Sequence, residues 1–244
     1  MIAIADTRHN QLLGALPEDV LERWLPDLER VEMPLGAVLY ESGEREMYVY
    51  FPTTSVVSLL YMTGDGATAE IAVVGNEGIV GVSLITGDGL TTGRALVQSG
   101  GEGLRMGADQ FKREINLAGV ALHLLLRYTQ ALITQMAQTA VCNRHHSLDQ
   151  QLCRWILLSL DRLQCSKLEM TQRLIADMLG VRREGVTEAA RKLQEARLIH
   201  YSRGHITVLN RKELEKRSCE CYAVVKREYD RLLPDNAAAL RRPG

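Results

Sequence analysis

Two short amphipathic segments joined by a glycine, at residues 170–193, constrain the fold of this 244-residue chain more than any other feature. Thr171 fits the N-cap position of a first helix, and Gly180 stands where that helix must end and the chain reverse. Apolar side chains between them recur at the spacing of one helix face: Leu174, Ile175, Met178 and Leu179. In the second segment the corresponding positions are Val186, Ala190 and Leu193. The pattern predicts a helix-turn-helix.

A predicted β-hairpin follows this pair of helices. Residues 198–201 and 206–209 are β-prone, and the sequence SRGH at residues 202–205 between them is a good turn former. Residues 210–213, NRKE, have the pattern of a capping box that opens a further helix. A helix-turn-helix followed by a two-stranded wing is an arrangement suited to binding DNA.

The outward face of the second helix carries side chains that can recognise DNA. A helix end in the major groove brings arginine to guanine O6 and N7, and glutamate to the amino group of cytosine N4. Other residues would contact phosphates and position the domain without reading sequence. The alternative is a solvated, salt-bridged helix face. The predicted base contacts are Arg183, Glu184, Thr187 and Glu188, and the predicted phosphate contacts are Thr171, Arg182, Arg191 and Arg203. Gly185 costs this helix ~1 kcal/mol, for which close approach to DNA is the expected reason.

A long helix is predicted over about residues 116–146, which contain no proline and only one glycine, Gly119. Apolar or small residues recur there in alternating steps of four and three, the spacing of a helix that packs along one seam against a parallel partner. The alternative is an amphipathic helix that packs only on its own domain. The predicted dimer seam consists of Leu122, Leu126, Thr129, Ile133, Met136 and Ala140. A second helix is expected over residues 147–163.

The N-terminal part of the chain reads as an all-β unit. Short β-prone runs at 37–40, 47–51, 55–62, 69–74 and 95–97 are separated by turn residues, a pattern typical of a sandwich or roll. A helix over residues 17–28 is expected to precede it. The chain is therefore predicted to be an α+β protein with two domains. These are a sensor domain at 1–146, which includes the dimerisation helix, and a winged helix-turn-helix domain at 147–244.

Charge is distributed unevenly between the two halves. Residues 1–110 carry 16 acidic and six basic side chains, a net charge of −10, whereas the remaining residues carry 14 acidic and 23 basic side chains, a net charge of +9. This asymmetry is expected when only one domain binds a nucleic acid. No apolar run approaches the ~20 residues of a membrane helix, and no secretory signal begins the chain. We expect a cytoplasmic protein with no membrane partner.

Cysteine and histidine patterns predict neither a disulfide framework nor a metal site. The five cysteines are irregularly spaced, so reduced thiols are expected. Cys219 and Cys221 form a lone C-x-C that could act as a redox switch, although an unpaired motif is more often inert. His145 and His146 lack ligands at a suitable spacing, which favours a hinge surface. The sequence identifies no cofactor.

Two motifs and the order of the elements resemble the Crp/Fnr family of bacterial transcription regulators over nearly the full chain. Residues 147–162, SLDQQLCRWILLSLDR, resemble that family's hinge and first DNA-domain helix, and residues 179–186, LGVRREGV, match its recognition motif. Arg183 and Glu184 fall on the Arg-Glu pair that reads a G·C base pair. Glu188 departs, since members that bind cyclic AMP have a second arginine there. The resemblance implies a cyclic-nucleotide-binding-like roll, a homodimer on near-palindromic promoter sites, and RNA polymerase as a partner if the protein activates.

The effector site implied by this resemblance is altered. Family members that bind cyclic AMP hold its ribose with a glutamate and its phosphate with an arginine. Here Val82 occupies the glutamate position, and Arg94 is shifted by one residue, which turns its side chain to the other face of a strand. We therefore predict that cyclic AMP does not control this protein and leave a small-molecule effector unidentified. The matching pocket would comprise Gly81, Val82, Ser83, Arg94, Ala95, Gln138 and Thr139.

Two other functional classes remain as alternatives. One is a cyclic-nucleotide-binding module that regulates a protein partner, against which the helix-turn-helix and wing argue. The other is a nucleotide-dependent enzyme. Residues 75–81, GNEGIVG, loosely resemble a dinucleotide loop, but their glycine spacing differs from that of the dinucleotide motif and no crossover unit follows. No catalytic residue is predicted.

Overall fold

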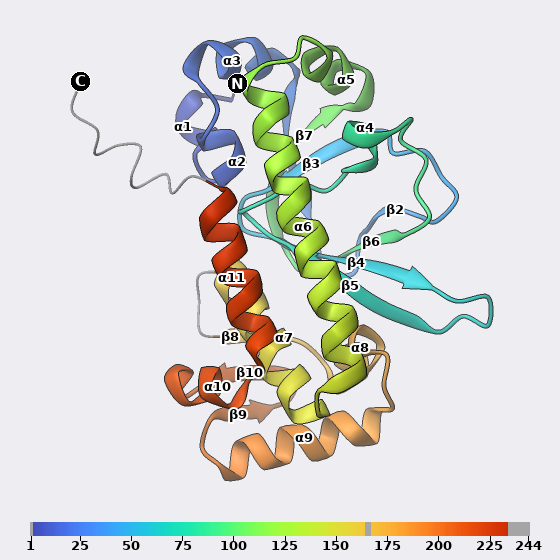
Figure 1. The fold of residues 1–244 in the computed structure, drawn as a ribbon, viewed down its shortest axis with the longest axis vertical. Helices are drawn as coiled ribbons and strands as arrows, with labels where there is room; N and C mark the ends of the chain where they lie inside the picture. The colour runs from blue at the N-terminus through green and yellow to red at the C-terminus, as the bar shows by residue number, and fades with distance from the viewer. Residues whose placement is uncertain (1, 164–166, 234–244) are drawn as a thin grey trace.

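The computed structural model describes residues 2–163 and 167–233, and it has the predicted α+β architecture. An N-terminal β-roll lies beside the long helix α6 (Val120–His145), and a smaller C-terminal unit of helices with a three-stranded sheet lies at one end of α6 (Figure 1). The order of roll, long helix and winged helix-turn-helix confirms the fold class expected from the sequence.

The β-roll consists of two antiparallel sheets with strand orders β1-β7-β3 and β2-β6-β4-β5. All five strand runs expected from the sequence are present to within two residues, and β1 and β7 complete the first sheet. The strands are β1 (Leu28–Met33), β2 (Val38–Tyr40), β3 (Tyr48–Pro52), β4 (Val56–Met62), β5 (Thr68–Val74), β6 (Arg94–Ser99) and β7 (Gly101–Gly107). The short helix α4 (Ser83–Thr86) follows β5, and α5 (Ala108–Asn116) follows β7.

Three short helices precede the roll: α1 (Ile4–Thr7), α2 (Gln11–Gly14) and α3 (Glu18–Trp24). The helix expected over residues 17–28 is therefore too long. Pro26 has no N–H to donate to the carbonyl four residues earlier, so α3 gives way to a 3₁₀ turn, η1 (Leu25–Asp27). Leu28 then begins β1 rather than ending a helix.

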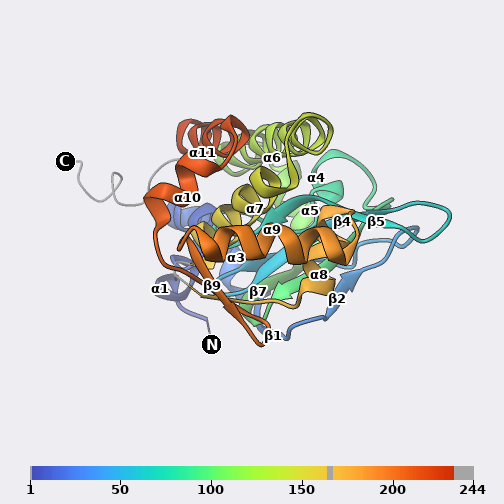
Figure 2. The same ribbon diagram turned by 90° about the horizontal axis from the view of Figure 1, so that it is seen from below.

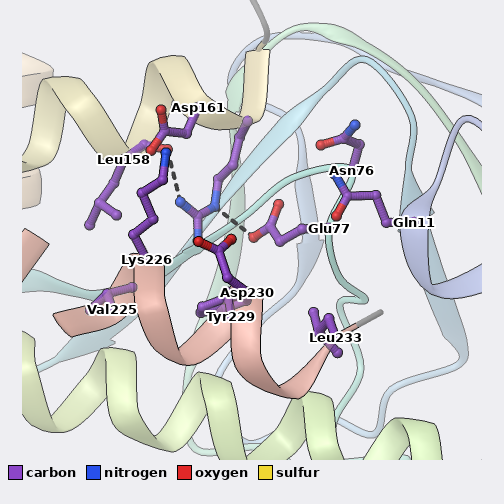
Figure 3. Close-up of a pocket in the computed structure, with 11 residues that line it drawn as sticks. Gln11, Asn76, Glu77, Leu158, Asp161, Val225, Lys226, Tyr229, Asp230 and Leu233 are labelled. Carbon is purple, nitrogen blue, oxygen red and sulfur yellow. Dashed lines mark hydrogen bonds and ion pairs between the residues drawn. The ribbon is translucent and has the colours of Figure 1, made fainter. Parts of the chain in front are cut away.

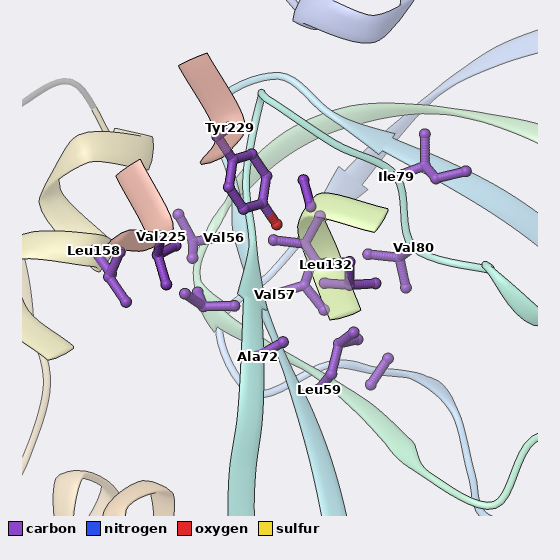
Figure 4. Packing of buried hydrophobic residues seen from close by; sticks show 14 of the residues in the cluster. Val56, Val57, Leu59, Ala72, Ile79, Val80, Leu132, Leu158, Val225 and Tyr229 are labelled. Carbon is purple, nitrogen blue, oxygen red and sulfur yellow. The ribbon is translucent and has the colours of Figure 1, made fainter. Parts of the chain in front are cut away.

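The core of the roll is closed by one face of α6. Leu132 of α6 lies among side chains of β4, β5 and the segment after β5, including Leu59 and Ile79 (Figure 4). Tyr128 is fully buried, and its hydroxyl group donates a hydrogen bond to the Ile79 carbonyl oxygen, with 3.0 Å between the two oxygens. A Cβ on Gly78 would lie 2.4 Å from the Tyr128 ring, so only glycine allows this approach. Helix and roll are thus packed as one unit.

The long helix starts later than expected. Ala118 and Gly119 have positive φ angles of 47° and 132°, which separate α5 from α6 and place the first residue of α6 at Val120 rather than near 116. Among the described residues, no single helix has the length and apolar composition to cross a membrane. The pair α5 and α6 has them together, but the two helices meet at a bend of 110°.

The C-terminal unit is built as the local signals predict. It contains α7 (Leu148–Leu163), α8 (Gln172–Leu179), α9 (Arg183–Glu195) and α10 (Arg211–Arg217), with a sheet of order β8-β10-β9. Thr171 Oγ1 accepts a hydrogen bond from the Leu174 amide at 3.3 Å, and Gly180 ends α8 in the left-handed region at φ 64°. The strands are β8 (Lys167–Glu169), β9 (Ile199–Ser202) and β10 (His205–Val208).

A final helix, α11 (Glu220–Leu232), was not expected from the sequence. It lies beside α6 in both views of the molecule (Figures 1 and 2) and packs along it. Its apolar face buries Tyr222, Val225 and Tyr229. Helix α6 is therefore covered by the roll and by α11 on different sides, and only part of its surface stays free.

Candidate nucleic-acid interface

Helix α9 buries one face and leaves the other in solvent. Val186, Ala190 and Leu193 are buried, as expected, because α9 packs against α7 and α8. Figure 2 views the molecule toward α9, which crosses in front of the other elements. The four predicted base contacts lie in the first two turns of α9 and are all exposed: Arg183, Glu184, Thr187 and Glu188.

A groove of about 510 Å³ connects the start of α9 with the start of α8 and with the β9–β10 hairpin. Three predicted DNA contacts line it, namely Thr171, Arg183 and Arg203. The hairpin is held in place by Tyr201, whose hydroxyl donates to the Met170 carbonyl at 2.8 Å. The backbone amide of Tyr201 donates a second hydrogen bond, to the side-chain oxygen of Gln194 on α9, also at 2.8 Å. The structure therefore gathers residues from three elements on one concave surface.

The tip of the hairpin is a two-residue turn. Ser202 pairs with His205, and the intervening Arg203 and Gly204 both have positive φ angles, 50° and 81°. Positive φ at both central residues is the geometry of a type I′ turn, which matches the twist of the flanking strands. The turn leaves Arg203 exposed at the tip of the wing.

Arg191, a predicted phosphate contact, is paired within its own helix. Its guanidinium lies 2.8 Å from the Glu188 carboxylate and also contacts Glu195. The hydrogen bond to Glu188 raises the pKa of Arg191, and the same bond lowers the pKa of Glu188. Exposed ion pairs of this kind are weak because water screens them, so a phosphate could replace them. Arg182, the other predicted phosphate contact of this helix, is exposed just before α9.

Gly185 lies where α9 passes the start of α7. A Cβ at this position would lie 2.8 Å from Leu148 Cδ2, the end of a flexible side chain that would have to move. This approach to α7 is a second constraint on the position, beside the approach to DNA that the sequence predicts.

Buried polar groups fix α7 against the β-roll. The Gln98 side chain on β6 donates to Ser159 Oγ at 2.9 Å, and its carbonyl oxygen accepts from Ser58 at 2.8 Å. Ser58 also contacts the carboxyl group of Glu70. Desolvation raises the pKa of this fully buried carboxyl to about 7, against the opposing effect of the Ser58 hydrogen bond. Polar side chains of the roll and of α7 thus form one connected network.

A second buried contact joins α7 to the roll. It lies between Arg162, in the last turn of α7, and Glu77, in the loop after β5. Arg162 Nε lies 2.7 Å from Glu77 Oε1, and its Nη2 donates to Gln135 Oε1 of α6 at 2.8 Å. The two residues border a pocket of about 410 Å³ between α7, α11 and the loop after β5, which Asn76 and Lys226 also line (Figure 3).

Three polar members of the predicted effector pocket, Arg94, Ser83 and Thr139, have partners within the chain. Arg94 Nε lies 3.2 Å from Glu41 Oε1, and Ser83 contacts the carboxyl group of Glu46, which is buried. Thr139 donates to the Gln135 carbonyl at 2.9 Å and accepts from Arg154 at 3.1 Å. Of the remaining members, Gly81 and Ala95 are buried, and Val82 and Gln138 are half-buried.

Four ligand-type side chains that the sequence analysis treated separately meet at the end of α6. The Sγ atoms of Cys142, Cys219 and Cys221 and a ring nitrogen of His146 all lie within 4.8 Å of one another. His145, the other member of the His pair, is exposed and outside this group. The contact with Cys142 lowers the pKa of Cys219 to about 5. The spacing of four between Cys142 and His146, which places both on one helix face, was a signal in the sequence.

Comparison with known proteins finds a similar domain for the C-terminal unit and a shared fold for most of the chain. Residues 150–217 match a Crp-like helix-turn-helix domain. The fold is shared with FixK2 from Bradyrhizobium japonicum, at 16% identity and a TM-score of 0.66 over 79% of this chain and 98% of that one. A CRP-family transcriptional regulator from Thermus thermophilus is 18% identical, with a TM-score of 0.62 over 78% of this chain and 96% of that one. The c-di-GMP-responsive regulator CLP from Xanthomonas campestris is 15% identical, with a TM-score of 0.60 over 80% of this chain and 100% of that one. No curated protein matches the sequence.

Proposed function

Because residues 150–217 form a Crp-like helix-turn-helix domain in a chain with the Crp/Fnr fold, we propose that this protein is a homodimeric DNA-binding transcription regulator of the cytoplasm. The observation that carries the proposal is the exposed start of α9, with Arg183 and Glu184 beside a groove that the wing borders. In the major groove Arg183 would donate to guanine and Glu184 would accept from cytosine. Thr171 and Arg203 would hold the flanking phosphates.

The dimer would form along the outer face of α6. Leu126 and Ile133 are 46% and 53% exposed, although both are large and apolar. Ala140, seven residues further along, is also exposed, and this heptad repeat over a 26-residue helix suits a second copy of α6. A two-fold dimer would present its recognition helices to successive major grooves ~34 Å apart, on a near-palindromic site. RNA polymerase would be a further partner at sites where the protein activates.

The proposed division into a sensor domain at 1–146 and a DNA-binding domain at 147–244 suggests how a signal could be transmitted. Helix α8 packs against β5, and Thr68 of β5 donates to the Asp177 carbonyl of α8 at 3.4 Å. A change in the roll would therefore act directly on the helix-turn-helix. Since α7 also contacts both α6 and the roll, the same change would alter the spacing of the two recognition helices.

Replacing Arg183 with alanine should weaken specific binding strongly while leaving the fold intact. The side chain is exposed, so its loss removes no core contact. Each bidentate contact to guanine contributes ~1–3 kcal/mol, and a dimer makes it twice. We expect the Kd for a selected DNA site to rise at least about 30-fold. The site would be selected from random duplexes by the wild-type protein and binding measured by fluorescence anisotropy at fixed salt.

Arg231→Ala is the matched control for this substitution. Arg231 lies near the end of α11, is exposed and, within the described part of the chain, forms an ion pair with Glu228 of its own helix alone. The Arg231→Ala substitution removes the same charge far from α9. The affinity of this variant for the selected DNA site should therefore stay within about twofold of that of the wild type. Wild-type affinity in Arg183→Ala, or equal losses in both variants, would contradict the assignment. It would also reopen the alternative of a regulatory module that binds a protein.

Cyclic AMP should not change DNA binding. Val82 offers no carboxylate for a ribose, and Arg94 is already paired with Glu41. In the same anisotropy assay, saturating cyclic AMP should alter the Kd by less than threefold. A tenfold increase in affinity corresponds to a coupling of ~1.4 kcal/mol and would show that the altered pocket still binds the nucleotide productively.

A further inference from the structure

The cluster at the end of α6 has the composition and spacing of a metal centre. Cys142 lies in the last turn of α6, His146 follows its last residue, and Cys219 and Cys221 flank the first residue of α11. The Sγ atoms of Cys142 and Cys219 are 3.5 Å apart, and Cys221 Sγ is 3.6 Å from His146 Nδ1. All three thiols are buried, which shields the group from solvent.

The two separations of 3.5 and 3.6 Å match those between ligands of a tetrahedral ion, and all four ligand atoms lie within 4.8 Å of one another. With metal–sulfur bonds of about 2.3 Å and metal–nitrogen bonds of about 2.0–2.1 Å, tetrahedral ligand atoms lie roughly 3.5–3.8 Å apart. Three thiolates and one imidazole form a ligand set that selects zinc. We propose that Cys142, His146, Cys219 and Cys221 bind one Zn²⁺ in a closed Cys₃His site. Four protein ligands leave no open coordination position, so the role is structural.

The surroundings of His146 fit this assignment. With Nδ1 facing Cys221, its other ring nitrogen, Nε2, lies 3.3 Å from the Glu220 carboxylate. A carboxylate on the outer nitrogen of a zinc-bound histidine fixes the ring orientation and its tautomer. Glu220 therefore serves as a positioning residue and is not itself a ligand.

The charge around the cluster is also balanced. Three thiolates and one Zn²⁺ leave a net charge of −1 on the site when the imidazole is neutral. Arg154 is buried on α7, and its guanidinium donates to Thr139 Oγ1 at 3.1 Å, three residues before Cys142 in α6. Its positive charge would oppose the net negative charge of the site.

The proposed ion would link the start of α11 to the end of α6, next to the connection between α6 and α7. The Gln151 side chain of α7 donates to the His146 carbonyl at 2.9 Å, so the cluster is connected to the first turn of α7 as well. Helix α11 otherwise depends on packing of its apolar face along α6. This role is independent of DNA binding, and the tests below measure the metal directly.

The first test is the metal content of the full chain, purified without a histidine tag and under reducing conditions. Elemental analysis should find one zinc per chain. After removal of zinc, added Co²⁺ should give the ligand-field bands of a tetrahedral ion together with sulfur-to-cobalt charge-transfer bands. A folded wild-type protein that contains no zinc and stays colourless with Co²⁺ would overturn the proposal. So would a Cys142–Cys219 disulfide in the purified, metal-free protein.

Matched variants test the ligand set. Cys221→Ser and His146→Ala should lose zinc and the cobalt spectrum. Cys153→Ser and His145→Ala should keep both, since Cys153 is buried outside the cluster and His145 is exposed. Glu220→Gln should keep the spectrum but weaken zinc affinity by about 10–100-fold. Equal losses in the ligand variants and their controls would contradict the site. The cobalt titration of the wild type decides the question even if a ligand variant does not fold.

Discussion

Replacing Arg162 with methionine is expected to destabilise the folded chain by about 3–5 kcal/mol. Arg162 is 6% exposed and Glu77 is its charged partner, with 2.7 Å between Nε and Oε1. Methionine has a similar length but carries no charge, so the variant leaves the largely buried Glu77 carboxylate without its ion-pair partner. It also removes the hydrogen bonds to Gln135 and to the Leu158 carbonyl. Urea unfolding followed by circular dichroism would measure the loss.

A double variant separates the cost of the unpaired charge from the cost of lost packing. In Arg162→Met with Glu77→Gln, neither partner of the ion pair is charged, and the glutamine can still accept the hydrogen bond that Gly75 donates to Glu77 at 3.0 Å. Replacing a whole buried ion pair is often close to neutral. We therefore expect the double variant to recover at least about 2 kcal/mol of the loss.

Arg173→Met is the control for this series. Arg173 forms an ion pair with Asp177 on the surface of α8, where its side chain is 77% exposed. Surface pairs contribute ~0.2–1 kcal/mol, so the same substitution should have a small effect there. If Arg162→Met cost no more than Arg173→Met, or if the double variant were no more stable than the single one, the contact would not hold α7 to the roll.

The helix-turn-helix could be predicted from sequence because its signals are local. Thr171 and Gly180 act through hydrogen bonding and backbone conformation at the ends of a single helix. The wing likewise depends on a two-residue turn at Arg203 and Gly204. Each of these features is determined within a few residues, so their pattern identified the elements and their order.

Helix α11 was missed although a weak signal existed. Tyr222, Val225, Tyr229 and Leu232 recur in steps of three and four, which is a helical period. Its start, however, has no recognisable cap, because Cys219 makes no side-chain hydrogen bond to the first turn. Only the packing of this face along α6 makes the helix evident.

Contacts between distant segments could not be predicted. Glu77 and Arg162 are each unremarkable in sequence, and a lone arginine in an amphipathic helix predicts a solvated side chain. In the cluster, Cys142 and His146 are four residues apart, but Cys219 lies more than 70 residues further along the chain. No local pattern relates the two ends, so the proposed zinc site depends on how α11 returns to α6.

The second large effect is expected at the proposed dimer seam. Wild-type protein should behave in solution as a particle of twice the chain mass of 27.2 kDa. Ile133→Asp places a carboxylate at the centre of the seam on each helix, where the two charges face each other near the two-fold axis. An unpaired charge buried in this way costs several kcal/mol, so the dimer Kd should rise by at least about a thousandfold. Sedimentation velocity at micromolar concentration should then detect monomers.

Thr134→Asp tests whether the effect belongs to the seam or to the helix. Thr134 is the next residue of α6, is half-buried and lies on a different side of the helix from Leu126 and Ile133. Both substitutions introduce the same side chain into the same turn, so any loss of helix stability is shared. Thr134→Asp should remain a dimer and bind the selected DNA site normally. Ile133→Asp should lose most of its affinity, because a monomer contacts only one half-site. A dimeric Ile133→Asp variant would place the interface elsewhere, and two monomeric variants would indicate damage to α6 itself.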